Sequence, residues 1–276
     1  MVPARLMIRY IKEFYRFLKH IVKGKDLLFT LIKNDFKKQY LGSYFGFFWA
    51  FAQPIVYMIV IWFVFTYGFR SVAHGKMPYF LWLMSGMIPW FFFSNALTAG
   101  TNSIVNNAFL VKKVAFRVSI LPIVQISSAL LLHVGLLIFL IIMFFFYGFK
   151  PSLYWLQLPF FMFCSFFLVL SFSWITSAVR VFVKDINNFV VVLLQIGFWA
   201  TPIFWNINMI APKHQWILKL NPAFYIVEGY RNTFINHKWF WEIPHLTLYF
   251  FIMSCITFIV GALIFKRLRP HFGDVL

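Results

Sequence analysis

Six long stretches of the chain contain no Lys, Arg, Asp or Glu. They cover residues 39–69, 77–111, 118–149, 151–179, 186–212 and 243–265, and the shortest runs for 23 residues. About 20 consecutive apolar residues form a helix that crosses the hydrocarbon core of a bilayer. None of the stretches shows the period-two alternation of a barrel strand. The pattern therefore predicts an all-α, polytopic membrane protein.

The stretches predict six transmembrane helices within a single membrane domain, residues 44–266, of a one-domain chain. We expect the helices at about residues 44–67, 79–97, 120–146, 154–182, 188–205 and 246–265. Pro54 and Pro89 lie inside the first two helices and are expected to kink them. Pro202 is expected to break the fifth helix near its outer end.

One connection, residues 206–242, is much longer than the others and is expected on the outer side of the membrane. Its apolar pieces are separated by polar residues and by Pro212 and Pro222. This pattern predicts short helices that lie on the outer half of the protein or dip back into it.

Residues 5–23 carry apolar side chains at helical spacing and six basic residues on the opposite face. They predict an amphipathic helix that lies flat in the cytoplasmic leaflet. A soluble helix packed on a partner is the alternative. A second short interfacial helix, capped by Asp26, is expected to lead to residue 40.

The basic residues are distributed unevenly between the two sides of the membrane. Of the 25 Lys and Arg residues, 18 fall on one side when successive connections are assigned to alternate sides. Because basic residues favour the cytoplasmic side, both termini are expected there, in an N-in/C-in topology. The formal net charge of +18 then reflects topology and attraction to anionic membrane lipids, with no nucleic acid as partner.

The interiors of the predicted spans hold no Asp, Glu, Lys or Arg. Ion-coupled transporters usually need such groups at membrane depth, so secondary active transport is disfavoured. His133 is the one mid-span histidine and is expected to be a hydrogen-bonded packing residue rather than a proton relay. Cys164 and Cys255 also fall inside spans and are expected to be buried and unpaired.

The sequence lacks the motifs of an enzyme and of a transporter that hydrolyses ATP itself. It has no phosphate-binding G-x-x-x-x-G-K-[ST] loop, no Cys/His cluster with metal-ligand spacing and no paired carboxylates. A membrane-embedded glycan or lipid transferase is therefore disfavoured. We expect a transport protein without a cofactor or metal of its own, and we expect any pumping to be driven by another chain.

Two connections between predicted spans have the composition of docking elements. Residues 102–117 are polar, then amphipathic, then basic, which predicts a short helix along the membrane surface. In residues 180–188, Lys184 and Asp185 precede two asparagines, Asn187 and Asn188, that are expected to cap the fifth helix. A mobile cytoplasmic subunit could dock on short, rigid connections of this kind. The alternative is that they are ordinary basic loops, which would have the same composition.

Four segments form an ordered set of motifs. They are residues 33–46 (KNDFKKQYLGSYFG, followed by Trp49 and Pro54), residues 106–122 (NNAFLVKKVAFRVSILP), residues 182–186 with 201–205 (FVKDI and TPIFW), and residues 220–222 (LNP) with Glu228 and Arg231. Together they resemble the permease subunits of bacterial ABC exporters for O-antigen, capsular polysaccharide and wall teichoic acid. Arg117 departs from the family pattern, which has a proline there, at the entry to the third span.

The resemblance implies a homodimeric permease in the bacterial cytoplasmic membrane, bound to two copies of a separate ATPase that holds the ATP and Mg²⁺. It implies that residues 102–113 and 180–186 are coupling elements that dock on the ATPases. It also implies that helices near residues 209–220 and 222–233 form an extracellular gate. The coupling candidates are Asn102, Asn106, Lys112, Lys113, Arg180, Lys184 and Asp185, and the gate candidates are Pro202, Asn221, Pro222, Glu228 and Arg231.

A glycan substrate would give a role to the aromatic residues, which make up 23% of the chain. Sugar rings have apolar C–H faces that stack on aromatic rings, and such contacts tolerate a sliding polymer. The candidate channel-lining residues are Trp49, Tyr57, Trp62, Trp82, Trp90, Phe198, Trp199 and Phe204. Lipid-facing Phe and interfacial Trp and Tyr are the competing explanation.

The preferred hypothesis is ATP-driven export of a lipid-linked surface glycan, with the O-antigen, capsule and teichoic acid classes all open. The diphosphate of the lipid carrier would be attracted by Arg5, Arg9, Lys37 and Lys38. The alternatives are a permease of similar build for a drug or small lipid and, less favoured, a membrane-embedded transferase.

Overall fold

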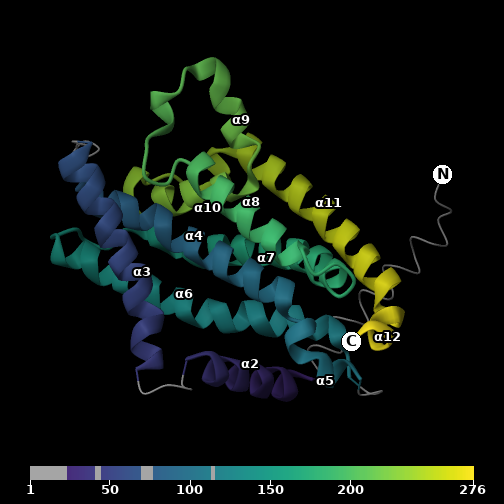
Figure 1. Cartoon of the computed structure of the whole chain (residues 1–276). Helices are drawn as coiled ribbons and strands as arrows, with labels where there is room; N and C mark the ends of the chain where they lie inside the picture. Colours follow the sequence, from purple (N-terminus) through teal and green to yellow (C-terminus); the bar gives the residue numbers. More distant parts are fainter. Residues whose placement is uncertain (1–23, 41–44, 70–76, 113–115) are drawn as a thin grey trace.

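The computed structural model describes residues 24–40, 45–69, 77–112 and 116–276. The regular elements in these ranges are helices, and Figure 1 shows them gathered into one bundle. Five helical segments in the described ranges are long and apolar enough to cross a bilayer. They are α3 with η1 (Gly46–Phe63, Val64–Gly68), α4 (Tyr79–Asn102), η3 with α6 (Val118–Ile120, Leu121–Phe146), η4 with α7 (Leu153–Gln157, Leu158–Arg180), and α11 with η9 and α12 (Pro244–Leu268, Arg269–His271, Phe272–Val275).

The fifth predicted span is shorter than the sequence suggested. Helix α8 (Ile186–Ala200) has 15 residues, which makes it about 22 Å long, against about 30 Å for the hydrocarbon core. Pro202 follows directly, and residues 201–205 continue without helical structure, as expected for a proline that cannot extend a helix. The expectation of six full spans is therefore corrected to five spans and one shorter apolar helix.

Helix α4 forms the centre of the bundle. It packs against α6, α7 and α10, and 78% of its most apolar window is buried, compared with 17% for α3. Apolar or small residues occupy every face of α4, which is typical of a helix surrounded by other helices. At Gly100, an added Cβ would overlap the side chain of Ser173 on α7, so the missing side chain allows these two helices to approach closely.

Helices α7 and α11 form a second close pair. Gly261 on α11 faces the backbone of α7, and the ring of Trp174 lies 4.9 Å from that of Phe258. Cys164 is buried on α7 as expected, but Cys255 on α11 is exposed at the surface of the chain. The expectation that both cysteines are buried is therefore wrong for Cys255, which lies on a helix with few buried positions.

Helix α2 (Lys25–Tyr40) lies along the start of α6, at the bottom of Figure 1. Asp35 of α2 accepts hydrogen bonds from Gln125 Nε2 of α6 at 2.5 Å and from Gln39 Nε2 of its own helix at 2.8 Å, and Gln39 Nε2 also lies 3.1 Å from Gln125 Oε1. Asp26 lies in the first turn rather than before the helix. The predicted amphipathic helix at 5–23 lies outside the described residues.

The long connection after α8 has two parts. The first contains η5 (Ile207–Met209), η6 (Pro212–His214) and α9 (Gln215–Lys219), and projects from the bundle at the top of Figure 1. The second contains α10 (Pro222–Arg231), η7 (Asn232–Asn236) and η8 (Phe240–Glu242). Most of α10 is buried against α4, α7 and α11, which confirms a helix that dips back into the bundle.

His133 connects this returning helix to α6. Its Nε2 lies 2.7 Å from the hydroxyl of Tyr230, and its ring lies 5.0 Å from that of Phe92. The side chain is 2% exposed. The structure thus confirms the expected hydrogen-bonded packing role.

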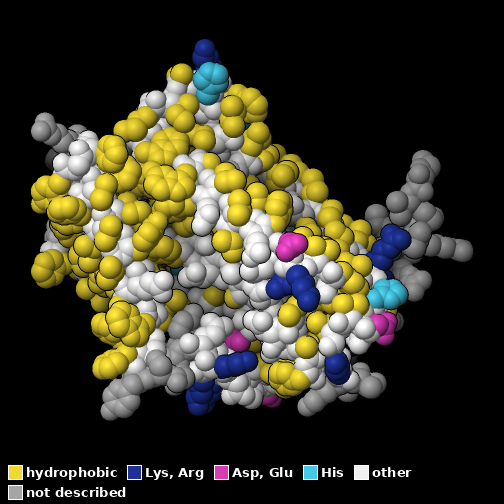
Figure 2. Space-filling model, viewed as in Figure 1, with side chains coloured by type: hydrophobic (Ala, Val, Ile, Leu, Met, Phe, Trp, Pro, Cys, Tyr) yellow, Lys and Arg dark blue, Asp and Glu magenta, His cyan; other side chains and the backbone are white. Residues whose placement is uncertain are grey.

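The outer surface has the composition of a membrane protein. Figure 2 shows hydrophobic side chains over much of one face, while the Lys and Arg side chains lie mainly in the lower right part of the view and at one tip. The exposed apolar residues are spread over α3, α6, α8 and α11. Such faces are stable in contact with lipid or with another apolar protein surface.

Substitution of Gly261 by alanine is expected to destabilise the α7–α11 pair. The new Cβ would lie 2.8 Å from the backbone oxygen of Ser171, which no side-chain rotation relieves. We expect a loss of about 1–3 kcal/mol, measured as a lower Tm in detergent micelles. Gly68→Ala is the control, because no atom lies within 4 Å of its Cβ position. Equal Tm values for both variants would contradict the close contact.

The contact between α2 and α6 is expected to depend on pH through Asp35. Burial raises the pKa of this carboxyl above its ordinary value, so the folded protein holds the proton more tightly than the unfolded chain. The stabilisation from protonated Asp35 is complete below the unfolded pKa and is lost as pH rises through the folded pKa. The Tm of the wild type, relative to Asp35→Asn, should therefore be higher at about pH 4.5 than at about pH 8. A difference of the opposite sign would contradict the raised pKa.

Candidate functional site

The two connections that the sequence marked as docking elements meet in the structure. Asn102, at the end of α4, donates a hydrogen bond from Nδ2 to Asn187 Oδ1 of α8 at 2.6 Å. Arg180, at the end of α7, donates from Nε to Asn102 Oδ1 at 3.4 Å. Next to these residues, the hydroxyls of Thr101, directly before Asn102, and Thr176, one turn before Arg180, lie 2.7 Å apart. We call Asn102, Arg180 and Asn187 the α4–α7–α8 junction.

The junction explains why the predicted helix cap is wrong. Helix α8 begins at Ile186, and the residue before it, Asp185, makes no side-chain cap hydrogen bond. Asn187 lies inside the first turn of α8, with its side chain directed to Asn102 instead of to its own backbone. A tertiary partner has replaced the local capping bond that sequence spacing suggested.

The remaining coupling candidates surround the junction. Asn106, Lys112, Lys184 and Asp185 are exposed, and Lys113 lies outside the described residues. The connection after α4 folds into η2 (Val105–Asn107) and α5 (Ala108–Val111), which confirms a short helix there. Exposed apolar residues lie beside the charged ones: Phe109, Phe182 and Val183 are 61%, 39% and 46% exposed. The surface over the junction therefore combines charges with apolar side chains.

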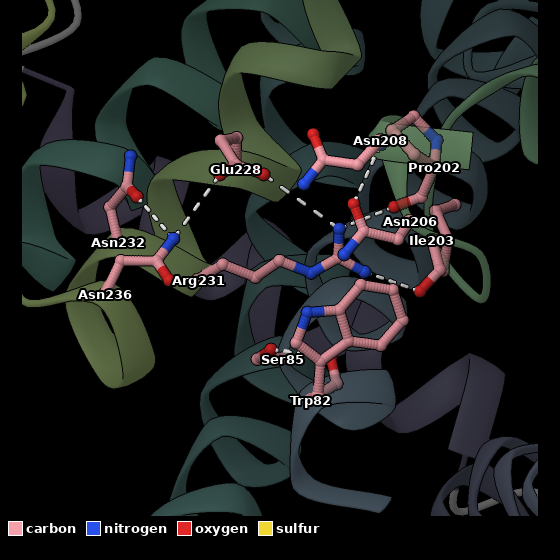
Figure 3. Close-up of polar contacts among 10 residues, drawn as sticks. All are labelled: Trp82, Ser85, Pro202, Ile203, Asn206, Asn208, Glu228, Arg231, Asn232 and Asn236. Carbon is pink, nitrogen blue, oxygen red and sulfur yellow. Dashed lines mark hydrogen bonds and ion pairs between the residues drawn. The ribbon is translucent and has the colours of Figure 1, made fainter. Parts of the chain in front are cut away.

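Two of the gate candidates, Pro202 and Glu228, lie at the guanidinium of a third, Arg231. Figure 3 shows it between the indole of Trp82 and the backbone that follows α8. Arg231 donates from Nη1 to the carbonyl oxygen of Pro202 at 2.5 Å and from Nη2 to that of Ile203 at 2.6 Å. Its Cζ lies 3.7 Å from the centroid of the Trp82 ring, which is a cation–π contact. Glu228 Oε2 lies 3.9 Å from Nη1.

Arg231 is 4% exposed and lies inside the helical bundle. Its position in the sequence predicts an outer loop, and the interiors of the spans are expected to be free of charge. The spans themselves are free of charge, but the returning helix α10 carries this guanidinium in among them. The guanidinium of Arg231 donates its hydrogen bonds to backbone carbonyls of the protein. These partners are typical of a residue that holds two segments together, and not of a residue that binds an ion.

The other gate candidates join the same region. Asn221 accepts a hydrogen bond from the backbone amide of Ala223 at 3.0 Å, as an N-cap with Pro222 in the first turn. It also donates from Nδ2 to Thr201 Oγ1 at 2.9 Å. Tyr79, an aromatic residue of the second predicted span, was not among the gate candidates, yet its hydroxyl donates to the carbonyl oxygen of Phe204 at 2.6 Å. In the sequence, its position directly after Pro78 marks it as the first residue of a helix.

The aromatic candidates divide into a buried and an exposed group. Trp82, Trp90, Phe198 and Phe204 are each less than 10% exposed, whereas Trp49, Tyr57 and Trp199 are each more than 40% exposed and Trp62 is intermediate. Phe198 lies at the centre of the buried group, with ring centroids 6.0 Å from Trp90 and 5.4 Å from Phe204. Trp90 also packs against Gly197, where an added Cβ would lie 2.9 Å away. These contacts pack α8 onto α4, and the role of the candidates in a channel stays a prediction.

The candidates for lipid diphosphate fall partly outside the described residues, since these begin after Arg5 and Arg9. Lys37 and Lys38 are exposed in the last turn of α2. In the part of the chain that the structure describes, no group of three or more His, Cys, Asp or Glu residues has the arrangement of a metal site.

Comparison with known proteins agrees with the resemblance found in the four motifs. The chain is 30% and 28% identical to two proteins from Klebsiella pneumoniae named O-antigen export system permease protein RfbA, over 91% of this chain and 95% of each relative. It is 26% identical to a protein of the same name from Myxococcus xanthus, over 97% of this chain and 99% of the relative. Residues 26–235 match the family described as ABC-2 type transporter. That match covers more than half of the sequence, and the chain belongs to the ABC-2 type transporter family.

Proposed function

We propose that this chain forms the membrane pathway through which an O-antigen type of polysaccharide, linked to its lipid carrier, is exported across the bacterial cytoplasmic membrane. The near full-length similarity to three O-antigen export permeases carries this proposal. The five apolar spans and the predominantly apolar surface are consistent with it. As an ABC-2 type permease subunit, the chain has no ATPase activity of its own.

A separate nucleotide-binding subunit supplies the energy in this proposal, with ATP and Mg²⁺ bound there. We place its docking surface over the α4–α7–α8 junction, where exposed apolar residues adjoin Lys184 and Asp185. The hydrogen bonds of Asn102 to Asn187 and Arg180 support this placement, because they tie the ends of three helices to one contact surface. In this proposal both termini lie on the cytoplasmic side, as the distribution of basic residues predicts.

A second copy of the chain and two ATPase subunits complete the proposed exporter. Helix α3 supports a dimeric pathway, since it is apolar but mostly exposed in the single chain. Its outward residues include Trp49 and Tyr57, and Trp199 is similarly exposed on α8. In this proposal the aromatic rings stack on the faces of sugar rings or pack against the second copy. Lys37 and Lys38 attract the diphosphate of the lipid carrier.

Deletion of the gene in its native host tests the proposed function. We expect the surface polysaccharide to disappear and the lipid-linked polymer to accumulate inside the cell. Affinity-tagged protein, solubilised in mild detergent, should bring down a cytoplasmic ATPase. Unchanged surface polysaccharide in the deletion strain, or a permease purified without any ATPase, would refute the proposal.

Substitution of Asn187 tests the junction. Asn187→Ala removes the 2.6 Å hydrogen bond that joins Asn102 to α8, while Asn102 keeps its bonds to the Thr98 carbonyl and to Arg180. We expect export to fall by about fivefold, which corresponds to the ~1 kcal/mol of one hydrogen bond, while ATP hydrolysis by the complex continues. Asn188→Ala is the matched control, because this neighbour is exposed on the same turn. Equal export by the two variants would remove the junction from the mechanism.

A further inference from the structure

Helix α8 ends inside the protein and leaves buried carbonyl groups behind it. Residues Thr201, Ile203 and Phe204 are 1%, 0% and 5% exposed. Their backbone is not helical, so the carbonyls of this segment are not paired along a helix. In an apolar environment such groups need partners from other elements, because no water reaches them.

Two other helices supply these partners. From α10, Arg231 donates to the carbonyls of Pro202 and Ile203. From α4, Tyr79 donates to the carbonyl of Phe204. The backbone after α8 is therefore bound to α10 by two charge-assisted hydrogen bonds and to α4 by one neutral bond, and charge-assisted bonds are the stronger kind.

The surroundings of Arg231 match a planar guanidinium. The indole of Trp82 covers one face of it at 3.7 Å. An added Cβ on Gly86, one turn further along α4, would lie 2.9 Å from Nη2, so the absence of a side chain there makes room for the group. A planar fork reaches two adjacent carbonyls at once, whereas a lysine ammonium is a single point charge.

A second link lies at the other end of α10. Asn221, the N-cap of α10, donates to Thr201 Oγ1 at 2.9 Å. Thr201 in turn donates to the carbonyl of Gly197 at 2.7 Å, in the last turn of α8. Both ends of α10 are thus connected to the segment that ends α8, by Asn221 at the start and by Arg231 at the finish.

We propose that Arg231 is a positioning residue of the exporter, which joins the end of α8 to the returning helix α10 so that the two move as one unit during transport. This inference rests on the proposed function. A displacement of α8 that begins at the α4–α7–α8 junction is then carried to α10 at the opposite end of α8. Without Arg231, the end of α8 moves without α10, and ATP hydrolysis is no longer converted into export.

The first test compares Arg231→Met and Arg231→Lys in the permease–ATPase complex. We expect Arg231→Met to lower surface polysaccharide by about tenfold or more, while ATP hydrolysis stays within about twofold of the wild type. Arg231→Lys should restore part of the export, since it keeps the charge but not the fork. Lys219→Met is the matched control, because it removes a cation from an exposed position of the same connection.

A variant that keeps Arg231 is needed as well, because Arg231→Met could lose export simply by misfolding. Gly86→Ala crowds Nη2 from the α4 side without removing the charge. It should lower export per ATP hydrolysed in the same direction as Arg231→Met. Wild-type export from Arg231→Met, or a parallel loss of export, ATP hydrolysis and complex formation in both variants, would overturn the proposal in favour of a purely structural role.

A cross-link tests the common movement directly. Thr201→Cys and Asn221→Cys are combined in a chain in which Cys164 and Cys255 are replaced by alanine. Because the two positions are expected to stay together, oxidation should form the cross-link and leave export within about twofold of the reduced protein. Loss of export on oxidation that reductant restores would overturn the inference. The gene deletion tests the proposed function separately, since its outcome does not depend on Arg231.

Discussion

The structure depends on one constraint, which is that backbone N–H and C=O groups inside an apolar medium must be paired within the protein. Continuous helices meet this requirement by themselves, and the five long spans do so. Helix α8 does not, because it ends at Ala200 while the chain is still buried. Side chains from two other helices then supply the missing hydrogen bonds, with Arg231 and Tyr79 donating to the buried carbonyls after α8. The one buried arginine described inside the bundle is thus explained by the broken helix.

Close packing at glycines explains how α4, α10 and α11 each approach α7 within the bundle. Helices in lipid gain little from burying apolar surface, and so they associate where small residues let their backbones approach. Gly100 against Ser173, Gly229 against Phe161 and Gly261 against the α7 backbone are contacts of this kind. On α7, the hydroxyl of Ser171 lies 2.7 Å from the carbonyl of Phe167 in its own helix and 3.4 Å from that of Ser254 on α11. This hydroxyl therefore adds a polar link between the closely packed helices α7 and α11.

Helices α4 and α8 run antiparallel and are connected near both ends. Asn102 and Asn187 join the end of α4 to the start of α8. At the opposite end, Arg231 lies between Trp82 of α4 and the carbonyls after α8. Between these points the helices pack through Trp90 and Gly197. A force applied to the surface over the junction has, through α8, a short and continuous path to the returning helix α10.

Charge-free stretches of this length and ordered motifs are local properties of the chain, so the sequence was sufficient for the membrane class, the approximate positions of the spans and the family. It also led to the prediction that the residues after α4 and α7, and those near Pro202 and Arg231, belong to functional regions. The break near Pro202 is local as well, although the helix before it, Ile186–Ala200, is shorter than predicted. The folded structure was needed to show that Asn187 bonds to Asn102 instead of capping its own helix, and that Arg231 lies inside the bundle. These two outcomes depend on partners at least 28 residues away along the chain, which no local pattern of hydrophobic and polar positions records.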